Sequence, residues 1–416
     1  MGRRASDVLV VGGGVVGLTA AWRALVAGAR VTVLDPAPGD GATRAAAGML
    51  APVGEAGFGQ EPLARLGVAS LALWPRFAAE LERAASLPPG AVGLETTGTL
   101  VLAYDADDVA ALRRLLDLHR AWGLPSHEIG TDAARRLEPA VGPRVTGAAR
   151  APGDHQVDPR AVHRALAVVV GSSPRATLVP RAATALTWAR GAVTGARDDA
   201  GAEHRAGLVV LAAGHASGAL HPDAPTRPVP GTALRLETAA DLLAGHVVRG
   251  HVQGRPVYVV PRRPGADGRR EVVVGATSDE REDSRTRSGD VFALLRDARA
   301  LLPALDEATF VEATTRPRPG SPDGAPVLGE AAEGLLLATG HHRNGVLLTP
   351  LTAAVVDDAL GATSPSASLS ASPSASPCAG PATDALVAAA LDAAARHARP
   401  GRFTARRTAH PEGAPA

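Results

Sequence analysis

The sequence is 416 residues long, which exceeds what one simple core usually covers, so we expect two domains. Its hydrophobic content of 45% and charged content of 20% are ordinary for a globular protein. A formal net charge of +1 argues against a dedicated nucleic-acid binder. The basic residues are all arginines, so chemistry that depends on a lysine Schiff base is excluded.

Cys378 is the single cysteine, so neither an intrachain disulfide nor a cysteine-based metal site can form, which favours a reducing, cytoplasmic location. No apolar run is long enough to predict a membrane span. Arg3-Arg4 ahead of an apolar stretch is typical of a signal peptide, and Met1-Gly2 with Ser6 matches a myristoylation pattern. We interpret both as accidental, because the apolar stretch is itself the first predicted strand.

The first elements predict a β-α-β unit. Residues 7–11 are short, apolar and β-branched, as in a buried parallel strand. A glycine-rich turn follows, then a helix over 15–28 that ends at Gly28, and a second strand at 30–34.

Further helices are predicted at 62–85, with Pro62 in the first turn and a kink at Pro75, and at 105–122, with Asp105 as the N-cap. Short β-rich segments separated by Gly/Pro turns then predict an inserted, mostly antiparallel sheet with one helix over 289–302. These segments are Thr99–Tyr104, Ala233–Glu237, Val257–Pro261, Glu271–Ala276 and Phe310–Thr315. Two more continuous apolar strands are predicted at Leu208–Ala212 and Leu335–Ala338.

The fold class is therefore α/β, with a Rossmann-like dinucleotide-binding domain and an inserted substrate domain. We assign 5–90, 150–225 and 317–361 to the first domain and 91–149 and 226–316 to the second. Residues 362–383 are rich in Ser, Ala and Pro and predict a disordered linker, followed over 384–416 by a C-terminal helix (384–397) and tail.

The turn after the first strand carries the pattern G-x-G-x-x-G. Gly12 allows the tight turn, Gly14 lets the backbone approach a pyrophosphate, and Gly17 lets helix and strand pack closely. The helix N-terminus, with Val15 and Val16, offers N–H groups to that anion. Asp35 ends the second strand, where it can accept hydrogen bonds from ribose hydroxyls, and this disfavours NADP. A glycine-rich loop of another α/β protein is the alternative interpretation.

Two features favour FAD over NAD. Residues 43–49 follow the second strand as a small-residue loop and helix start, where phosphates and a flavin ring fit without steric conflict. The strand Leu208–Ala212, followed by Ala213 and Gly214, is typical of the second nucleotide-contacting strand of flavoproteins with two dinucleotide folds.

Read together, residues 5–360 resemble the D-amino-acid oxidase superfamily, and within it the glycine oxidases of thiamine biosynthesis. The specific pieces are 46–52 (AAGMLAP), 153–159 (GDHQVDP), 318–324 (RPGSPDG) and 338–348 (ATGHHRNGVLL). The resemblance implies non-covalent FAD and oxidation of glycine by oxygen, through an imine, to glyoxylate, ammonia and hydrogen peroxide. The expected substrate is glycine or another small amine. The resemblance further implies a role in supplying thiazole synthesis, thiazole synthase as a partner, and a homo-oligomer.

The resemblance also implies roles for individual residues. Arg318 would pair with the substrate carboxylate, Arg343 would lie close to it, Tyr258 would add a hydroxyl contact, and Met49 and Ala51 would line a small substrate space. FAD contacts are implied for Gly12, Gly14, Val15, Val16, Gly17, Asp35, Thr43, Arg44, Gly48, Met49, Ala183, Gly214, His341, His342, Arg343, Asn344, Gly345, Val346 and Leu347. No metal site and no catalytic acid or base are implied.

Several alternatives stay open. Thr315-Arg316-Pro317 replaces a more common Gly-Leu pair, and His342 stands where an aromatic is common. Sarcosine or D-amino-acid oxidation, a dehydrogenase that reduces a quinone, or a non-catalytic flavin-binding subunit are therefore alternatives. Arg318 could instead be a surface arginine in a turn, Arg343 could cap backbone carbonyls, and Tyr258 could pack in the core.

Overall fold

The computed structural model describes residues 6–281, 283–361 and 381–403. Residues 1–5, Cys378 and most of the predicted linker lie outside the described residues. The chain divides into two compact units by its contacts. Unit 1 comprises Met1–Gly41, Leu166–Pro228 and Arg318–Ala416, and unit 2 comprises Ala42–Ala165 and Val229–Pro317.

Unit 1 is built on a sheet whose central strands are parallel. Its order is β17-β18-β11-β1-β2-β8, and β9 and β10 extend β11 as antiparallel strands. The strands are β1 (Ser6–Val11), β2 (Val31–Leu34), β8 (Ala176–Val179), β9 (Ala183–Ala189), β10 (Ala192–Asp198), β11 (Glu203–Leu211), β17 (Val327–Ala332) and β18 (Leu335–Thr339). Only β17 pairs antiparallel to its neighbour along the main order. The predicted strands 7–11, 30–34, 208–212 and 335–338 are all confirmed.

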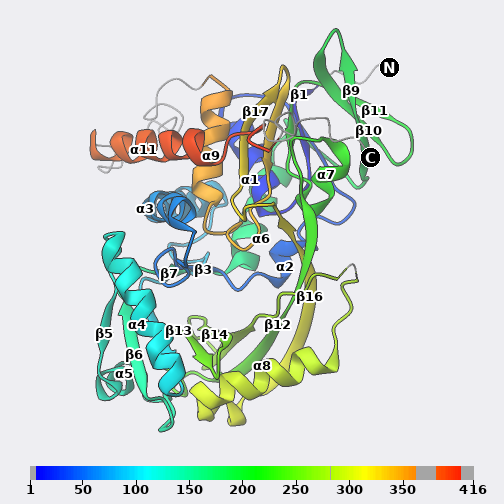
Figure 1. Ribbon diagram of the computed structural model, residues 1–416. Helices are drawn as coiled ribbons and strands as arrows, with labels where there is room; N and C mark the ends of the chain where they lie inside the picture. Colours follow the sequence, from blue (N-terminus) through cyan, green and yellow to red (C-terminus); the bar gives the residue numbers. More distant parts are fainter. Residues whose placement is uncertain (1–5, 282, 362–380, 404–416) are drawn as a thin grey trace, which may run out of the picture. The chain divides into compact units, whose positions relative to one another are not determined.

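Helices cover this sheet within unit 1 (Figure 1). They are α1 (Val15–Val26), α7 (Ser217–Leu220), α9 (Thr349–Ala359) and α11 (Pro381–His397), with the short turn η1 (Gly214–Ala216). Arg23 of α1 donates its Nε to the carboxylate of Asp357 of α9 at 2.8 Å, and both side chains are buried. The ion pair joins two helices that are far apart in the sequence.

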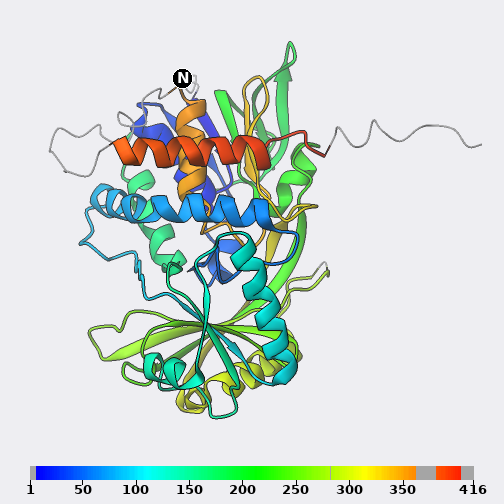
Figure 2. The same cartoon turned by 60° about the vertical axis from the view of Figure 1, so that its left-hand side comes forward.

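The helix α11 begins at Pro381, so the predicted linker ends three residues earlier than expected. Proline is tolerated in a first helical turn, where its missing N–H would have no partner. Figure 2 shows α11 lying across α9. Val387, Ala390 and Ala394 are buried, and the N–H of Leu328 in β17 donates to the carbonyl of Ala398 at 2.8 Å.

Unit 2 is built on a second, mostly antiparallel sheet of order β16-β12-β15-β14-β13-β4-β6-β5. Among the strand pairings described for this sheet, only β13–β4 is parallel. The strands are β4 (Thr99–Ala103), β5 (His127–Ile129), β6 (Gly147–Ala151), β12 (Arg227–Ala239), β13 (Val247–Val252), β14 (Arg255–Pro261), β15 (Arg269–Gly275) and β16 (Thr309–Gly320); β3 (Met49–Leu50) and β7 (His155–Gln156) form a separate pair. The predicted fold class is confirmed.

The helices of unit 2 are α2 (Ala42–Ala45), α3 (Glu61–Ala84), α4 (Ala106–Ala121), α5 (Thr131–Leu137) and α8 (Ser288–Leu301), with η2 (Pro303–Glu307); α6 (Pro159–Gly171) runs from unit 2 into unit 1. α3 continues through Pro75, and Asp105 caps α4 by accepting the N–H of Asp108. Side chains alternate across the second sheet. Val257 and Val259 pack with α8, whereas Tyr258 and Val260 face the other side together with Ala47.

The two units differ from the predicted domain boundaries. Residues 42–90 and 150–165 were assigned to the dinucleotide domain, but their contacts place them in unit 2. The reason is local pairing: Met49 pairs with Gln156 in the β3–β7 ladder, and the side-chain amide of Gln156 donates to the carbonyl of Pro261 on β14. Hydrogen bonds between segments far apart in sequence are not visible in composition or periodicity.

Candidate dinucleotide and substrate site

At Gly12 and Gly17 the glycine turn of unit 1 leaves no space for a Cβ atom. Gly12 has φ +112°, and a Cβ on it would lie 2.2 Å from the carbonyl oxygen of Ala212, at the end of β11. A Cβ on Gly17 would lie 1.9 Å from the carbonyl oxygen of Gly12. The two glycines therefore let the turn, the helix α1 and the neighbouring strand approach more closely than any other residue permits.

The N-terminus of α1 lies directly after the glycine turn. Gly14 is the N-cap residue, and no side chain caps the helix there. The first turn, which includes Val15 and Val16, contains no acidic residue. An anion placed at this end would meet the positive end of the helix dipole.

Asp35 follows β2 and binds the glycine turn itself. One carboxylate oxygen accepts the N–H of Gly13 at 2.5 Å, and the other accepts the N–H of Ala37 at 2.7 Å. A Cβ on Gly13 would lie 3.1 Å from Cβ of Asp35. The acid thus shapes the turn, a role that sequence reasoning missed, and its contact with a ribose stays a prediction.

The segment 338–348 of unit 1 is tied to the strand that carries Arg318. Arg318 is half-buried near the end of β16, and the N–H of His342 donates to the carbonyl of Pro319 at 3.0 Å. His341 is buried, with Nε2 3.1 Å from the hydroxyl of Thr352. Burial lowers the pKa of His341 to about 4, so this imidazole is neutral near pH 7.

The rest of that segment forms the turn into α9. The N–H of Asn344 donates to the carbonyl of His341 at 2.8 Å, and the N–H of Leu348 donates to the carbonyl of Asn344 at the same distance. Arg343 is exposed, whereas Val346 and Leu347 are buried. Gly345 lies in the same turn.

Two other predicted FAD contacts also lie in unit 1. Gly214 begins η1 with φ +60°, and its carbonyl accepts the hydroxyl of Thr339 at 3.1 Å. Ala183 is half-buried at the start of β9. Unit 1 thus holds the glycine turn, Asp35, Ala183, Gly214, Arg318 and the 341–347 turn, whereas Thr43, Arg44, Gly48, Met49, Ala51 and Tyr258 belong to unit 2.

In unit 2 the predicted residues of the 43–51 segment are fixed by β7. Gly48 has φ +77°, and a Cβ on it would lie 2.0 Å from the carbonyl oxygen of Val157. The N–H of Val157 donates to the carbonyl of Gly48 at 2.9 Å. Thr43 and Ala51 are buried, and Met49 is half-buried.

Arg262, which follows β14 of the second sheet, binds both the segment that contains Gly48 and the segment that contains Val157. Its Nη1 donates to the carbonyl of Val157 at 2.8 Å, and its Nη2 donates to the carbonyl of Ala47. The same Nη1 lies 3.3 Å from the side-chain oxygen of Gln156. Burial lowers the pKa of Arg262 to about 10, which still leaves the guanidinium charged near pH 7.

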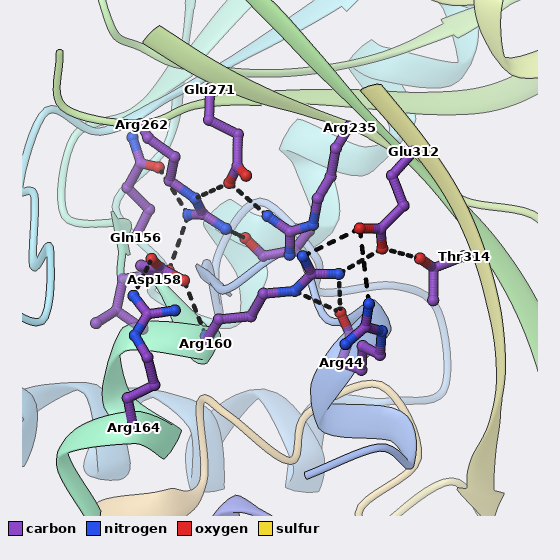
Figure 3. A network of polar contacts seen from close by, with 12 residues as sticks. Arg44, Gln156, Asp158, Arg160, Arg164, Arg235, Arg262, Glu271, Glu312 and Thr314 are labelled. Carbon is purple, nitrogen blue, oxygen red and sulfur yellow. Dashed lines mark hydrogen bonds and ion pairs between the residues drawn. The ribbon is translucent and has the colours of Figure 1, made fainter. Parts of the chain in front are cut away.

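Arg262 is part of a network of arginines and acids (Figure 3). Arg235, buried on β12, donates to Glu271, and Nε of Arg262 lies 3.8 Å from the same carboxylate. Arg160 donates to Glu312 at 2.6 Å and to the carbonyl of Arg44 at 3.1 Å. The network therefore attaches α2 and the β3–β7 pair to β12, β15 and β16.

The hydrogen bond from Arg160, together with smaller contributions from Thr314 and Arg44, lowers the pKa of Glu312 to about 2. Arg44 itself is exposed, and its guanidinium lies 3.8 Å from Glu312. Its contact with FAD stays a prediction, and its carbonyl accepts hydrogen bonds from Arg160.

Tyr258 lies on β14 on the face of the second sheet that carries Ala47 and Met49. It is 9% exposed. A Cβ on Gly275 of the neighbouring strand would lie 2.3 Å from its hydroxyl oxygen, so glycine makes room for this ring. Tyr258 therefore does pack in the core, which is compatible with a hydroxyl contact at its tip.

Asp154 is a fully buried acid in the same unit that sequence reasoning did not single out. Its carboxylate accepts the N–H groups of Val53 at 3.1 Å and Gly54 at 2.9 Å. Burial raises the pKa of Asp154 to about 7, against the lowering effect of those two N–H groups. Its signal in the sequence is the motif 153–159, which the resemblance had marked without giving Asp154 a role.

Within 6–281, 283–361 and 381–403, no three His, Cys, Asp or Glu side chains gather as a metal site would require. Over the same ranges, no helix combines the length and the apolar character needed to cross a bilayer.

The chain belongs to the FAD dependent oxidoreductase family, whose model it matches over residues 7–359. Among its relatives, glycine oxidase from Geobacillus kaustophilus (strain HTA426) is 32% identical over 362 residues, which cover 85% of this chain and 92% of that protein. The crystal structure of glycine oxidase from Geobacillus kaustophilus has a TM-score of 0.76 at 30% identity, covering 90% of this chain and 100% of that one.

The bifunctional protein ThiO/ThiG of Trichormus variabilis (strain ATCC 29413 / PCC 7937) is also 32% identical, over 361 residues. The match covers 85% of this chain but 52% of that protein, so the chain spans about half the length of this relative.

The described residues of unit 1 fit the dinucleotide that the family name implies. Gly12 and Gly17 exclude side chains from the turn, and Gly14 begins a helix whose first turn has no acidic residue. These residues would hold the pyrophosphate of FAD, and Asp35 lies beside them.

Proposed function

We propose that this protein is an FAD-dependent oxidase of glycine or a closely related small amine. The observation that carries the proposal is the family membership, together with 32% identity to a glycine oxidase over 85% of this chain. The resemblance of the sequence motifs assigns Arg318, Tyr258, Met49 and Ala51 to the substrate site. The overall reaction takes glycine, oxygen and water to glyoxylate, ammonia and hydrogen peroxide.

Bound FAD supplies the oxidant, which accepts a hydride equivalent from the substrate Cα. The protein must bind the amino acid by its carboxylate and orient the Cα–H bond. Arg318 suits this purpose because a planar guanidinium can bind a carboxylate through two parallel hydrogen bonds. Arg343 adds a second positive charge, and the hydroxyl of Tyr258 adds a further donor.

No side-chain base is needed if the substrate amine arrives neutral. The two buried titratable groups described above are unsuited to that role. His341 is neutral but fully buried, and the carboxylate of Asp154 is already bound to two backbone N–H groups. The resulting imine would hydrolyse in water, or would supply thiazole assembly in thiamine biosynthesis with thiazole synthase as a partner.

We expect this site to select amino acids with a small side chain or none. Ala51 has no exposed surface, and Met49 lies beside Tyr258 in one apolar cluster. If Met49 lines the substrate space, we expect glycine to be accepted, whereas a bulky D-amino acid would require Met49 to move. Homo-oligomerisation and a cytoplasmic location complete the proposal.

The test is anaerobic mixing of the purified, FAD-loaded protein with glycine, sarcosine, D-alanine and D-valine, followed by air. The proposal predicts that glycine reduces the flavin most efficiently and that air restores the oxidised flavin with formation of hydrogen peroxide. Reduction by sarcosine or D-alanine alone would move the activity to another member of the superfamily. Reduction without peroxide on admission of air would indicate a dehydrogenase, and no reduction by any amine would indicate a non-catalytic flavoprotein.

A further inference from the structure

Arg249 lies among the proposed substrate residues of unit 2, although nothing in the sequence motifs marked it. It sits on β13 directly opposite Tyr258 of β14 in the antiparallel ladder. Opposite residues in such a ladder project from the same face of a sheet. Arg249 therefore lies on the face of the sheet that carries Tyr258, and this face packs against Met49.

One guanidinium nitrogen makes two contacts. Nη1 of Arg249 donates to the carboxylate of Glu55 at 2.8 Å and lies 3.5 Å from the Sδ atom of Met49. The side chains of Arg249 and Glu55 are 16% and 14% exposed, so the ion pair is largely shielded from water. A pair in this environment holds its geometry better than a surface pair does.

The loop that carries Glu55 is itself fixed. The buried carboxylate of Asp154 binds the N–H groups of Val53 and Gly54, the two residues immediately before Glu55. A Cβ on Gly54 would lie 3.6 Å from Cδ of Arg249, so the stem of the arginine runs along this loop. Arg249 is thus held at its stem and at its charged end.

Met49 gains a fixed position from this arrangement. Methionine has three rotatable side-chain bonds and a soft sulfur, and it adapts to whatever space adjoins it. The N–H group of Arg249 at the sulfur restricts that freedom, because Met49 would lose this hydrogen bond if its side chain moved away.

We infer that Arg249, through its contact with Met49, sets the size limit on the amine that this site accepts. The inference rests on the proposed function, in which Met49 lines the substrate space. Arg249 is a positioning residue in this account: it does not touch substrate, and Glu55 determines where its guanidinium lies. Loss of the contact would let Met49 withdraw and admit larger side chains.

The experiment compares Arg249→Met with Arg113→Met in the FAD-loaded enzyme. Arg113 pairs with Glu128 on the surface, with side chains 64% and 48% exposed, so its variant controls for loss of one arginine from unit 2. Two quantities are measured: the ratio of kcat/KM for glycine to that for D-alanine and D-2-aminobutyrate, and the calorimetric Kd of acetate, propionate and butyrate.

We expect the glycine preference of Arg249→Met to fall by about tenfold, which is the range that one methylene group makes in a size-selective pocket. Butyrate should gain affinity relative to acetate, and Arg113→Met should match the wild type in both measurements. Glu55→Gln, which keeps an acceptor but removes its charge, should give a smaller change in the same direction. Arg249→Lys should restore part of the glycine preference.

The inference is overturned if Arg249→Met stays FAD-loaded and keeps both ratios within about twofold of the wild type, a change too small to reflect a lost size limit. If Arg249→Met does not fold, an unchanged ratio in Glu55→Gln would overturn it equally. Failure of the proposed function would look different, because it would appear in the wild type itself, whose flavin glycine would not reduce.

Discussion

Gly17 lies against Gly12 so closely that a methyl group on Gly17 would come within 1.9 Å of the Gly12 carbonyl oxygen. That oxygen belongs to the backbone and cannot rotate away. Gly17→Ala should therefore separate α1 from the glycine turn and lower stability by about 1–3 kcal/mol. The affinity for FAD should fall at least tenfold, which corresponds to roughly 1.4 kcal/mol of binding free energy.

The measurement for Gly17→Ala is FAD titration of the apoprotein followed by flavin fluorescence. Gly171→Ala is the matched control, since nothing lies within 4 Å of a Cβ at that exposed position. The control should bind FAD as the wild type does. Equal affinity in the two alanine variants would mean that the close approach at Gly17 does not support the cofactor site.

Arg262 and Arg263 are neighbours in sequence with very different surroundings. Arg262 is buried and donates to two backbone carbonyls, whereas Arg263 is half exposed and pairs with Glu95. Arg262→Met leaves buried acceptors without their donor, so we expect unfolding to become easier by about 3–5 kcal/mol.

The adjacent variant, Arg263→Met, removes a surface ion pair and should change stability by about 0–1 kcal/mol. Chemical denaturation of both proteins, monitored by tryptophan fluorescence, makes the comparison. Similar midpoints for the two variants would contradict the role assigned to Arg262 in fixing the 47–48 and 156–157 segments.

Asp154 should make stability depend on pH. Burial raises its pKa to about 7 from 3.8. Between these two values the folded protein holds a proton that the unfolded chain has released, so stability falls as pH rises from about 4 to 7 and levels off above the folded pKa. Asp154→Asn removes this slope, which amounts to roughly 2–4 kcal/mol over the interval.

Asparagine offers a single side-chain oxygen to the two N–H groups that Asp154 accepts, so Asp154→Asn should also lose about 1–3 kcal/mol at every pH. Thermal midpoints of wild type, Asp154→Asn and the exposed-site control Asp132→Asn, measured at intervals from pH 4 to 8 (about one unit apart), test the sign. A difference between wild type and Asp154→Asn that does not vary with pH would show that Asp154 does not titrate in this range.

Arg402 ties the C-terminal segment to the turn that follows Arg318. Its Nε and Nη2 donate to the two carboxylate oxygens of Asp323 at 2.9 and 3.0 Å, and Nη2 also donates to the carbonyl of Ala325. Arg402→Met should lower stability by about 2 kcal/mol.

Truncation after residue 361 should lower stability further, because it also exposes the apolar face of α9 that α11 covers. The control is Arg396→Met, since Arg396 is exposed on α11 and pairs only with Asp392 among the described contacts. Differential scanning calorimetry compares the three proteins, and a truncated chain as stable as the full one would mean that α11 contributes nothing to unit 1.

Arg318→Leu should leave FAD binding intact and weaken glycine binding. Removing one partner of a charge pair in a site shielded from water costs about 2–5 kcal/mol. We expect KM for glycine to rise by at least about thirtyfold, which corresponds to roughly 2 kcal/mol of binding free energy. The affinity for acetate should fall as well. Unchanged glycine kinetics in a fully FAD-loaded variant would remove Arg318 from the substrate site.

The sequence predicts the strands and the glycine turn because their determinants are local. Alternating or continuous apolar residues identify strands such as 7–11 and 257–261, and the spacing of Gly12, Gly14 and Gly17 reflects contacts within one β-α-β unit. Asp105 as the cap of α4 is another local feature, and it was predicted correctly.

The contacts that complete the candidate site could not be predicted, because they join distant segments. Arg262 binds the carbonyl of Ala47 across 215 positions, and Arg249 binds Glu55 across 194. One arginine among many carries no signal of its partner, and the docking of α11 is likewise invisible in an alanine-rich segment. The domain boundaries at 42–90 and 150–165 differ for the same reason.

The most direct test of the account is rapid anaerobic mixing of the FAD-loaded protein with glycine and with glycine deuterated at Cα. Glycine should bleach the oxidised flavin absorption, and deuterium at Cα should slow the bleaching several-fold through a primary isotope effect on breaking the Cα–H bond. A protein that binds FAD but keeps the oxidised spectrum at saturating glycine would contradict this prediction, as would a chain that does not bind FAD.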